Sequence, residues 1–138
     1  MAAARTLTIP DPGADANFMM STLDAIKTVS QTEVSASGST TVQFTFKNVA
    51  GTAITGIRNM LMWLSDSAGA PVSAATSLAV ATNGAVTTLV VGQFSNVQCS
   101  AAGLLGVTVT VAGATTKYLS FKLPDGKVLT STVLTINA

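Results

Sequence analysis

Alternating apolar and polar residues run through most of the chain and predict short antiparallel strands. In residues 41–47, Val42, Phe44 and Phe46 alternate with polar or charged neighbours, as in a strand with one buried face. The same period-two pattern recurs in residues 105–111 and 119–123. Turn-forming residues separate these stretches about every ten residues, so we expect a β-sandwich of about seven strands.

The other strands are predicted from weaker patterns between turn signals. They lie at residues 28–35, 57–64, 72–80, 86–91 and 128–136. In the last of them the alternation slips between Val133 and Leu134, which predicts a β-bulge. Asn83-Gly84 and Pro124-Asp125-Gly126 are the strongest turn signals. Strands do not alternate with long helices, so we do not expect a parallel α/β sheet.

The N-terminal segment has a different pattern, and we divide the chain into an arm, residues 1–27, and a sandwich domain, residues 28–138. Arg5 to Ile9 alternates as a short edge strand does, and residues 10–13 end it. Residues 14–26 place apolar side chains at helical spacing and predict a short helix with Asp15 as its N-cap. Its methionine-rich stripe fits either its own domain or a neighbouring subunit.

The strand at residues 57–64 contains the only tryptophan and is apolar on both faces. Leu61 and Trp63 point one way, and Met60, Met62 and Leu64 point the other way. A strand of this kind is covered on both sides. We expect Trp63 to be a buried aromatic of the core. The methionine face then needs the N-terminal segment or another subunit as its cover.

The predicted interface therefore combines apolar residues of the arm with the methionine face of this strand. Its members are Phe18, Met19, Met20, Leu23, Met60, Met62 and Leu64.

Charge is scarce and unevenly placed. Charged residues make up 9% of the chain, against roughly 25% in an ordinary soluble domain. From Ser67 to Thr116, fifty residues carry no Asp, Glu, Lys or Arg. Such a stretch forms either a neutral soluble surface or a surface buried in an assembly. We favour the assembly, because interface cores are depleted in charge.

No residue pattern predicts a catalytic, cofactor or metal site, so we expect a non-enzymatic protein. The chain has no histidine, and the lone Cys99 is expected to be a small buried hydrophobe. Ser65-Asp66-Ser67 has no base to complete a nucleophilic site, and Asp66 and Asp125 lack a second nearby carboxylate for Ca²⁺. The net charge of +1 without a basic cluster argues against nucleic acid. No run approaches the ~20 apolar residues of a membrane helix.

Three stretches carry a resemblance to a known group of proteins. They are Ile54 to Asp66, the turn Ala101-Ala102-Gly103 with the alternating valines after it, and Tyr118 to Lys127. Over roughly residues 40–138 the chain resembles Ig-like domains of tailed-bacteriophage virion proteins. It departs from them at Gln98-Cys99-Ser100, where an acidic turn residue would be expected.

The resemblance implies an Ig-like sandwich and a non-enzymatic role in the virion. We expect a capsid decoration (cement) protein on the phage head, without cofactors. Its expected partners are the major capsid protein and copies of itself in a homo-oligomer such as a trimer. The alternative is a tail or fibre module that contacts host surface glycans, although the sequence offers few aromatics for this. A bacterial adhesin module is a third hypothesis.

Overall fold

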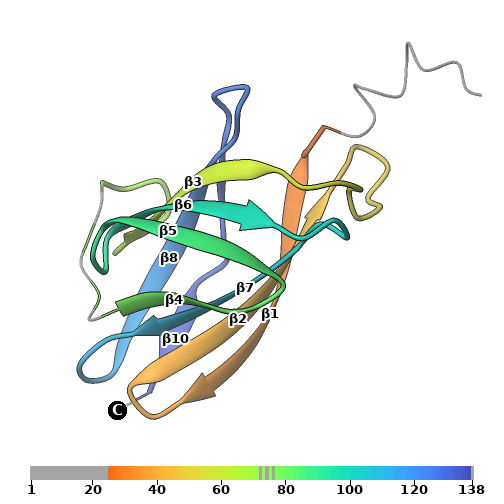
Figure 1. Cartoon of the computed structure of the whole chain (residues 1–138). Coiled ribbons are helices and arrows are strands. Elements are labelled where there is room, and N and C mark those ends of the chain that lie inside the picture. Colours follow the sequence, from red (N-terminus) through yellow and green to blue (C-terminus); the bar gives the residue numbers. More distant parts are fainter. Residues whose placement is uncertain (1–24, 72, 74, 76, 138) are drawn as a thin grey trace, which may run out of the picture.

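The computed structural model describes residues 25–71, 73, 75 and 77–137. They form two antiparallel β-sheets packed face to face (Figure 1). This confirms the predicted all-β sandwich, although the described residues form ten strands rather than about seven. Within the described ranges no helix is long and apolar enough to cross a membrane.

The first sheet has four strands in the order β1-β2-β7-β4. Their bounds are β1 Thr28–Ala36, β2 Ser39–Lys47, β7 Leu104–Thr110 and β4 Ser77–Thr82. The second sheet has six strands in the order β10-β8-β3-β6-β5, with β9 also paired to β8. Their bounds are β10 Leu134–Ile136, β8 Thr115–Lys122, β3 Asn59–Ser65, β6 Phe94–Cys99, β5 Gly84–Val90 and β9 Val128–Thr130.

The strand order confirms the predicted Ig-like class. With β1, β2 and β3 as strands A, B and C, the last strands β7, β8 and β9–β10 become E, F and G. The two sheets then read A-B-E and G-F-C, which is the central arrangement of the immunoglobulin fold. Between C and E the chain adds three strands. β4 lies beside E in the first sheet, and β6 and β5 extend the C side of the second.

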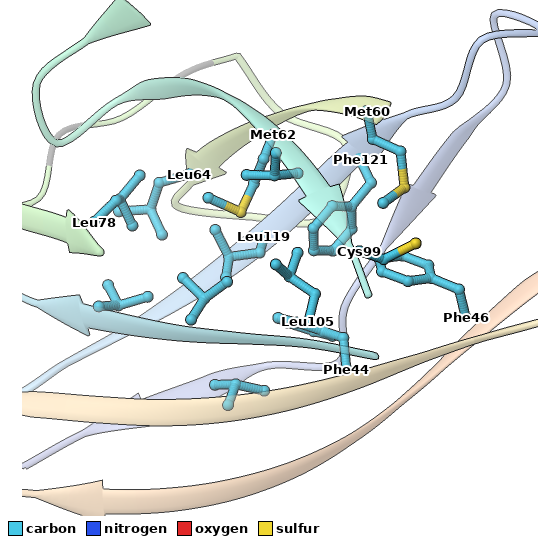
Figure 2. Packing of buried hydrophobic residues seen from close by; sticks show 14 of the residues in the cluster. Phe44, Phe46, Met60, Met62, Leu64, Leu78, Cys99, Leu105, Leu119 and Phe121 are labelled. Carbon is cyan, nitrogen blue, oxygen red and sulfur yellow. The ribbon is translucent and has the colours of Figure 1, made fainter. Parts of the chain in front are cut away.

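The core lies between the sheets and follows the predicted alternation. Val42, Phe44 and Phe46 of β2 are fully buried. The inward apolar residues of β7 and β8 are fully buried as well: Leu105, Val107, Val109, Leu119 and Phe121. The rings of Phe44 and Phe121 meet edge to face with centroids 4.9 Å apart, and Phe46 meets Phe121 in the same way at 5.3 Å (Figure 2). In antibody domains a disulfide joins strands B and F. Here an aromatic pair joins them, and Cys99 is buried and unpaired.

The predicted strand at residues 128–136 is two short strands with a bulge between them. Ser120 pairs with Thr130 in β9, whereas Lys117 pairs with Leu134 in β10, so one extra residue is inserted in between. Ser131 keeps the two strands connected. Its backbone N–H donates to Leu119 O at 2.8 Å, and its hydroxyl accepts from Leu119 N at 2.9 Å. The bulge predicted from the slip at Val133 is therefore confirmed.

Two strand predictions need correction. β6 was not predicted at all, and β4 is described only from Ser77, later than the expected start at residue 72. The Asn83-Gly84 turn is present, with Asn83 at φ 53° and Gly84 at φ 144°. It does not close a hairpin, because β4 and β5 belong to different sheets. At Asn83 the chain crosses from one layer of the sandwich to the other.

Candidate interaction surfaces

The two faces of β3 have the opposite roles to those predicted. Met60, Met62 and Leu64 are at most 2% exposed and point into the core beside Leu119 and Phe121 (Figure 2). Their assignment to an interface is therefore wrong, since the other sheet of the same domain already covers them. Leu61 and Trp63 lie on the outer face and are half-buried.

The strand itself contains a signal for this choice. Met60, Met62 and Leu64 form an unbroken apolar row, whereas Leu61 and Trp63 are flanked on their own face by Asn59 and Ser65. An unbroken row is the better candidate for a fully dry core. Trp63 was expected in the core because it is large and apolar. Large aromatics are, however, rarely fully buried even where they pack well.

Trp63 belongs to an aromatic pair on the outer face of the second sheet. It lies opposite Phe94 of β6, with the two rings stacked at 6.2 Å between centroids. The indole Nε1 donates to the carbonyl of Ala70 at 3.3 Å. This bond ties the loop after β3 to the ring. The sequence analysis did not identify Phe94 as the partner of Trp63, because β6 was not predicted.

Amide side chains lie beside this pair on the same face. Asn96 and Asn59 are exposed, and Gln98 Nε2 donates to Asn59 Oδ1 at 3.0 Å. An open depression of about 320 Å³ runs from Asn59 and Asn96 across Leu61 to Lys122 and Pro124. The outer face thus combines an apolar floor with amide groups and the side chain of Lys122.

The N-terminal part of the predicted interface lies outside the described residues. Phe18, Met19, Met20 and Leu23 belong to it, and so does most of the predicted helix. Its last residues, Ala25 and Ile26, are not helical. Ile26 is 7% exposed and joins the core of the sandwich.

The uncharged part of the chain, residues 67–116, contains β4 to β7, and its exposed surface includes the edge strand β5. β5 is the last strand of its sheet, and six of its seven residues are exposed. At its end Leu89, Val90 and Val91 are 54%, 49% and 76% exposed. We call these three residues the apolar tip.

The opposite side of the sandwich is closed by polar side chains of β1. Glu33 Oε1 accepts from Thr135 N at 2.7 Å, and Gln31 Oε1 accepts from Thr132 N at 3.0 Å. The Ser35 hydroxyl donates to Thr135 O at 2.9 Å. These bonds satisfy backbone groups on the outer edge of the last strand, which would otherwise be open to another chain.

The Ser65-Asp66-Ser67 stretch is a turn rather than a reactive site. The Ser65 hydroxyl donates to Ser67 O at 3.0 Å. Asp66 forms an ion pair with Lys117, whose ammonium also donates to the Ser73 hydroxyl at 3.3 Å. The hydrogen bond from Lys117 lowers the pKa of the Asp66 carboxyl.

Cys99 and the acidic residues are the remaining groups with possible chemistry in the part of the chain that the structure describes. Burial raises the pKa of the Cys99 thiol, which favours its protonated form. Across the described ranges, no three residues among His, Cys, Asp and Glu lie close enough to hold a metal ion.

Comparisons with known proteins add only distant structural similarity. No family model and no curated protein matches the chain. A cohesin module from a Clostridium perfringens family 33 glycoside hydrolase is similar at TM-score 0.47 and 10% identity, over 81% of this chain and 97% of that one. The D00-D0 domain of intimin follows at 0.43 and 14%, over 84% of this chain and 50% of that one. The outer membrane decaheme cytochrome OmcA has a TM-score of 0.38 and 19% identity, over 81% of this chain and 22% of that one.

Proposed function

We propose that the protein is a non-enzymatic structural component of a tailed-phage particle, a decoration protein of the head. In this role it binds the major capsid protein and copies of itself. The observation that carries the proposal is the apolar tip, three consecutive exposed apolar residues within a fifty-residue stretch that has no formal charge.

The physical argument concerns what a free protein tolerates on its surface. Exposed apolar residues next to neutral ones promote association, because no charge keeps molecules apart. Interface cores have the same composition, apolar and poor in charge. A protein held permanently in a particle buries such a surface against its partner. The resemblance of residues 40–138 to phage Ig-like domains suggests which particle this is.

The test measures binding to undecorated phage heads by co-sedimentation, with Val91→Lys as the test variant. A lysine in an apolar interface should weaken binding by about tenfold or more. Val49→Lys is the matched control, since Val49 is 58% exposed and lies in the turn after β2. Equal binding by both variants, or no binding by the wild type, would contradict the proposal.

Light scattering of the free protein adds an independent measurement. A concentration-dependent oligomer that Val91→Lys dissociates, and Val49→Lys does not, would support contact between copies through the apolar tip. A strict monomer would leave only the capsid protein as its partner.

A second function, contact with host surface glycans by a tail or fibre module, is favoured by the outer face. The Trp63–Phe94 pair gives that face two stacked aromatics, and the amides of Asn59, Asn96 and Gln98 lie beside it. Retention of the domain on cell-wall polysaccharide tests this function. Asn96→Ala should abolish retention, whereas Thr32→Ala, exposed on β1, should not. No retention of the wild type would eliminate glycan contact.

A further inference from the structure

The corner between β4 and β5 contains the one asparagine of the chain that is followed by glycine. Every other asparagine precedes Phe, Val, Met or Ala. An asparagine loses ammonia when the backbone nitrogen of the next residue attacks its side-chain carbonyl carbon and closes a succinimide ring. A following glycine favours this attack, because it has no Cβ to shield the nitrogen and its backbone rotates freely.

The two residues of this corner are open to water. Asn83 and Gly84 are both exposed. Asn83 has a φ of 53°, which lies in the left-handed region and outside the range of a regular strand. Solvent therefore reaches the side-chain amide that has to react and the ring that has to be opened.

The attacking nitrogen takes no part in the pairing of β5 with β6. Gly84 lies opposite Cys99, and Cys99 donates its own N–H to Arg58 O, on the β3 side, at 3.1 Å. The N–H and the C=O of a residue in an antiparallel ladder point to the same side. Gly84 and Cys99 are therefore a non-hydrogen-bonded pair, and the β5–β6 ladder does not hold the Gly84 nitrogen.

One neighbouring side chain restrains the Asn83 amide. Asn83 Nδ2 donates to Gln43 Oε1 at 3.2 Å, and the Thr82 hydroxyl donates to the same oxygen at 3.2 Å. Gln43 of β2 can reach across to this corner because Gly106 of β7 lies between it and Thr82 in the first sheet. A Cβ on Gly106 would lie 2.5 Å from Thr82 Oγ1. The bond to Gln43 fixes the Asn83 side chain and opposes the rotation that ring closure needs.

We propose that Asn83 is a site of spontaneous deamidation in the folded protein, and that Gln43 slows the reaction by holding the amide. The Gly84 nitrogen loses its proton to solvent and bonds to Asn83 Cγ, and the Cγ–Nδ2 bond breaks to release ammonia. Water then opens the succinimide at either carbonyl and leaves an aspartate or an isoaspartate at position 83. The net change converts an amide and water into a carboxylate and ammonium.

The product would change the charge and the packing of the corner. A carboxylate at position 83 would be the first charge within residues 67–116, and it would cancel the net charge of +1. At the start of β5, this charge would also disfavour pairing of that strand with another chain. Isoaspartate lengthens the backbone at a corner where a Cβ on Gly84 would already lie 2.5 Å from Gln98 O. The reaction goes beyond the proposed function and does not depend on what the protein binds.

Peptide mapping of the folded full-length protein after incubation in mildly alkaline buffer tests the site. The peptide with residues 83–84 should gain the mass of an amide-to-acid conversion, and isoelectric focusing should show a new acidic isoform. Asn48 is the internal control, because it lies in the turn after β2 but precedes Val49, and it should keep its amide. Conversion of both asparagines, of neither, or of Asn83 in urea but not in the folded protein would overturn the proposal.

A pair of variants tests the role of Gln43. Gln43→Ala removes the acceptor of the Asn83 amide, and the folded variant should deamidate about two- to tenfold faster, the factor that corresponds to one hydrogen bond. Thr45→Ala, on the same face of β2, is the matched control and should react at the wild-type rate. In urea both variants should react equally fast. A folded Gln43→Ala protein that deamidates no faster than Thr45→Ala would show that Gln43 does not restrain the amide.

Discussion

The two sides of the sandwich differ in how the backbone edges of their outer strands are covered. On the β1–β10 side, side chains of one sheet hydrogen-bond the backbone edge of the other, and Gly38 N adds a bond to Asn137 O at 2.7 Å. On the β4–β5 side, the chain crosses between the sheets at Asn83, and the described residues leave the edge of β5 without a partner strand. We call these the closed side and the open side.

The two sides also differ in their charged residues, which are few in this chain. Only six residues of the chain are Asp or Glu, and one of them, Glu33, accepts hydrogen bonds from Thr135 N and the Thr40 hydroxyl on the closed side. The open side has no charged residue in either β4 or β5. A closed edge needs no partner, whereas a neutral open edge pairs with any suitable strand that reaches it. The open side is therefore the side whose backbone edge is available for pairing with another strand.

Both sides pack on the same core, so we expect the largest loss of stability from a substitution at the centre of that core. Phe121→Ala removes the ring that contacts both Phe44 and Phe46. The cavity should lower the free energy of unfolding by about 3–5 kcal/mol. Urea denaturation followed by tryptophan fluorescence measures it, with Val49→Ala as an exposed control. A loss no greater than that of the control would contradict the assignment of the core.

The closed side should be destabilised when Glu33 is replaced. Glu33→Ala leaves Thr135 N and the fully buried Thr40 hydroxyl without their carboxylate acceptor. Because a charged acceptor is lost from partly buried donors, we expect a cost of roughly 1.5–3 kcal/mol in denaturant unfolding.

A matched variant separates the lost hydrogen bonds from the lost charge. Glu33→Gln keeps an acceptor oxygen at nearly the same place, and it should recover most of the stability. If Glu33→Gln is as unstable as Glu33→Ala, the bonds to Thr135 and Thr40 do not hold the closed side together.

The open side should be most sensitive at its corner, Gly84. A Cβ at Gly84 would lie 2.5 Å from Gln98 O and 2.7 Å from Leu105 Cδ1, and the φ of 144° disfavours any side chain. Gly84→Ala should therefore cost roughly 1–3 kcal/mol. Gly113→Ala is the control in thermal unfolding, because Gly113 also has positive φ but no atom within 4 Å of its Cβ. If Gly84→Ala and Gly113→Ala lose the same amount of stability, the corner at Gly84 is not tightly packed.

Much of the fold was predictable from local patterns, for reasons that particular residues show. In β2, Val42, Phe44 and Phe46 alternate without exception, so period two alone identified the inward face. β6 was not predicted because Ser95 points inward and is buried, which interrupts the apolar row of Val97 and Cys99. A polar residue facing the core removes the contrast that the pattern needs.

The features that distinguish the two sides were not predictable, because they depend on distant partners. Glu33 and Gln31 bond to residues more than one hundred positions away. Asn83-Gly84 is a turn in any local sense, but only the pairing of β4 with β7 and of β5 with β6 makes it a crossing between sheets. Local turn chemistry does not determine which sheet the next strand joins.

The prediction of the interface on β3 was wrong for the same reason, because it also depended on residues distant in the sequence. Met60 and Trp63 lie on different faces of one strand, and period two separated them correctly. Which face turns inward depends on the opposite sheet. As a half-buried residue, Trp63 should lose less on truncation than the ~3–5 kcal/mol of a fully buried aromatic.

The smallest expected effect concerns the ion pair that holds the loop leading toward the open side. Asp66 and Lys117 connect the turn after β3 to β8. The lowered pKa of Asp66 means that its carboxylate is more favoured in the folded state than in the unfolded chain. Its stabilising contribution is therefore complete above the pKa of an aspartate in the unfolded chain, and it is lost as the pH falls through the lower pKa of the folded state.

Thermal unfolding of the wild type and Asp66→Asn across this range measures the contribution. The variant should have the lower Tm at pH 7, and the gap should narrow as the pH falls below about 3.9, the ordinary pKa of an aspartate. Because Asp66 is largely exposed, salt should also reduce the gap. A gap that stays constant from about pH 7 to about pH 2 would show that the charge on Asp66 does not hold the loop. The position of the loop would then rest on two other hydrogen bonds, from Trp63 Nε1 to Ala70 O and from Ser73 N to Leu64 O.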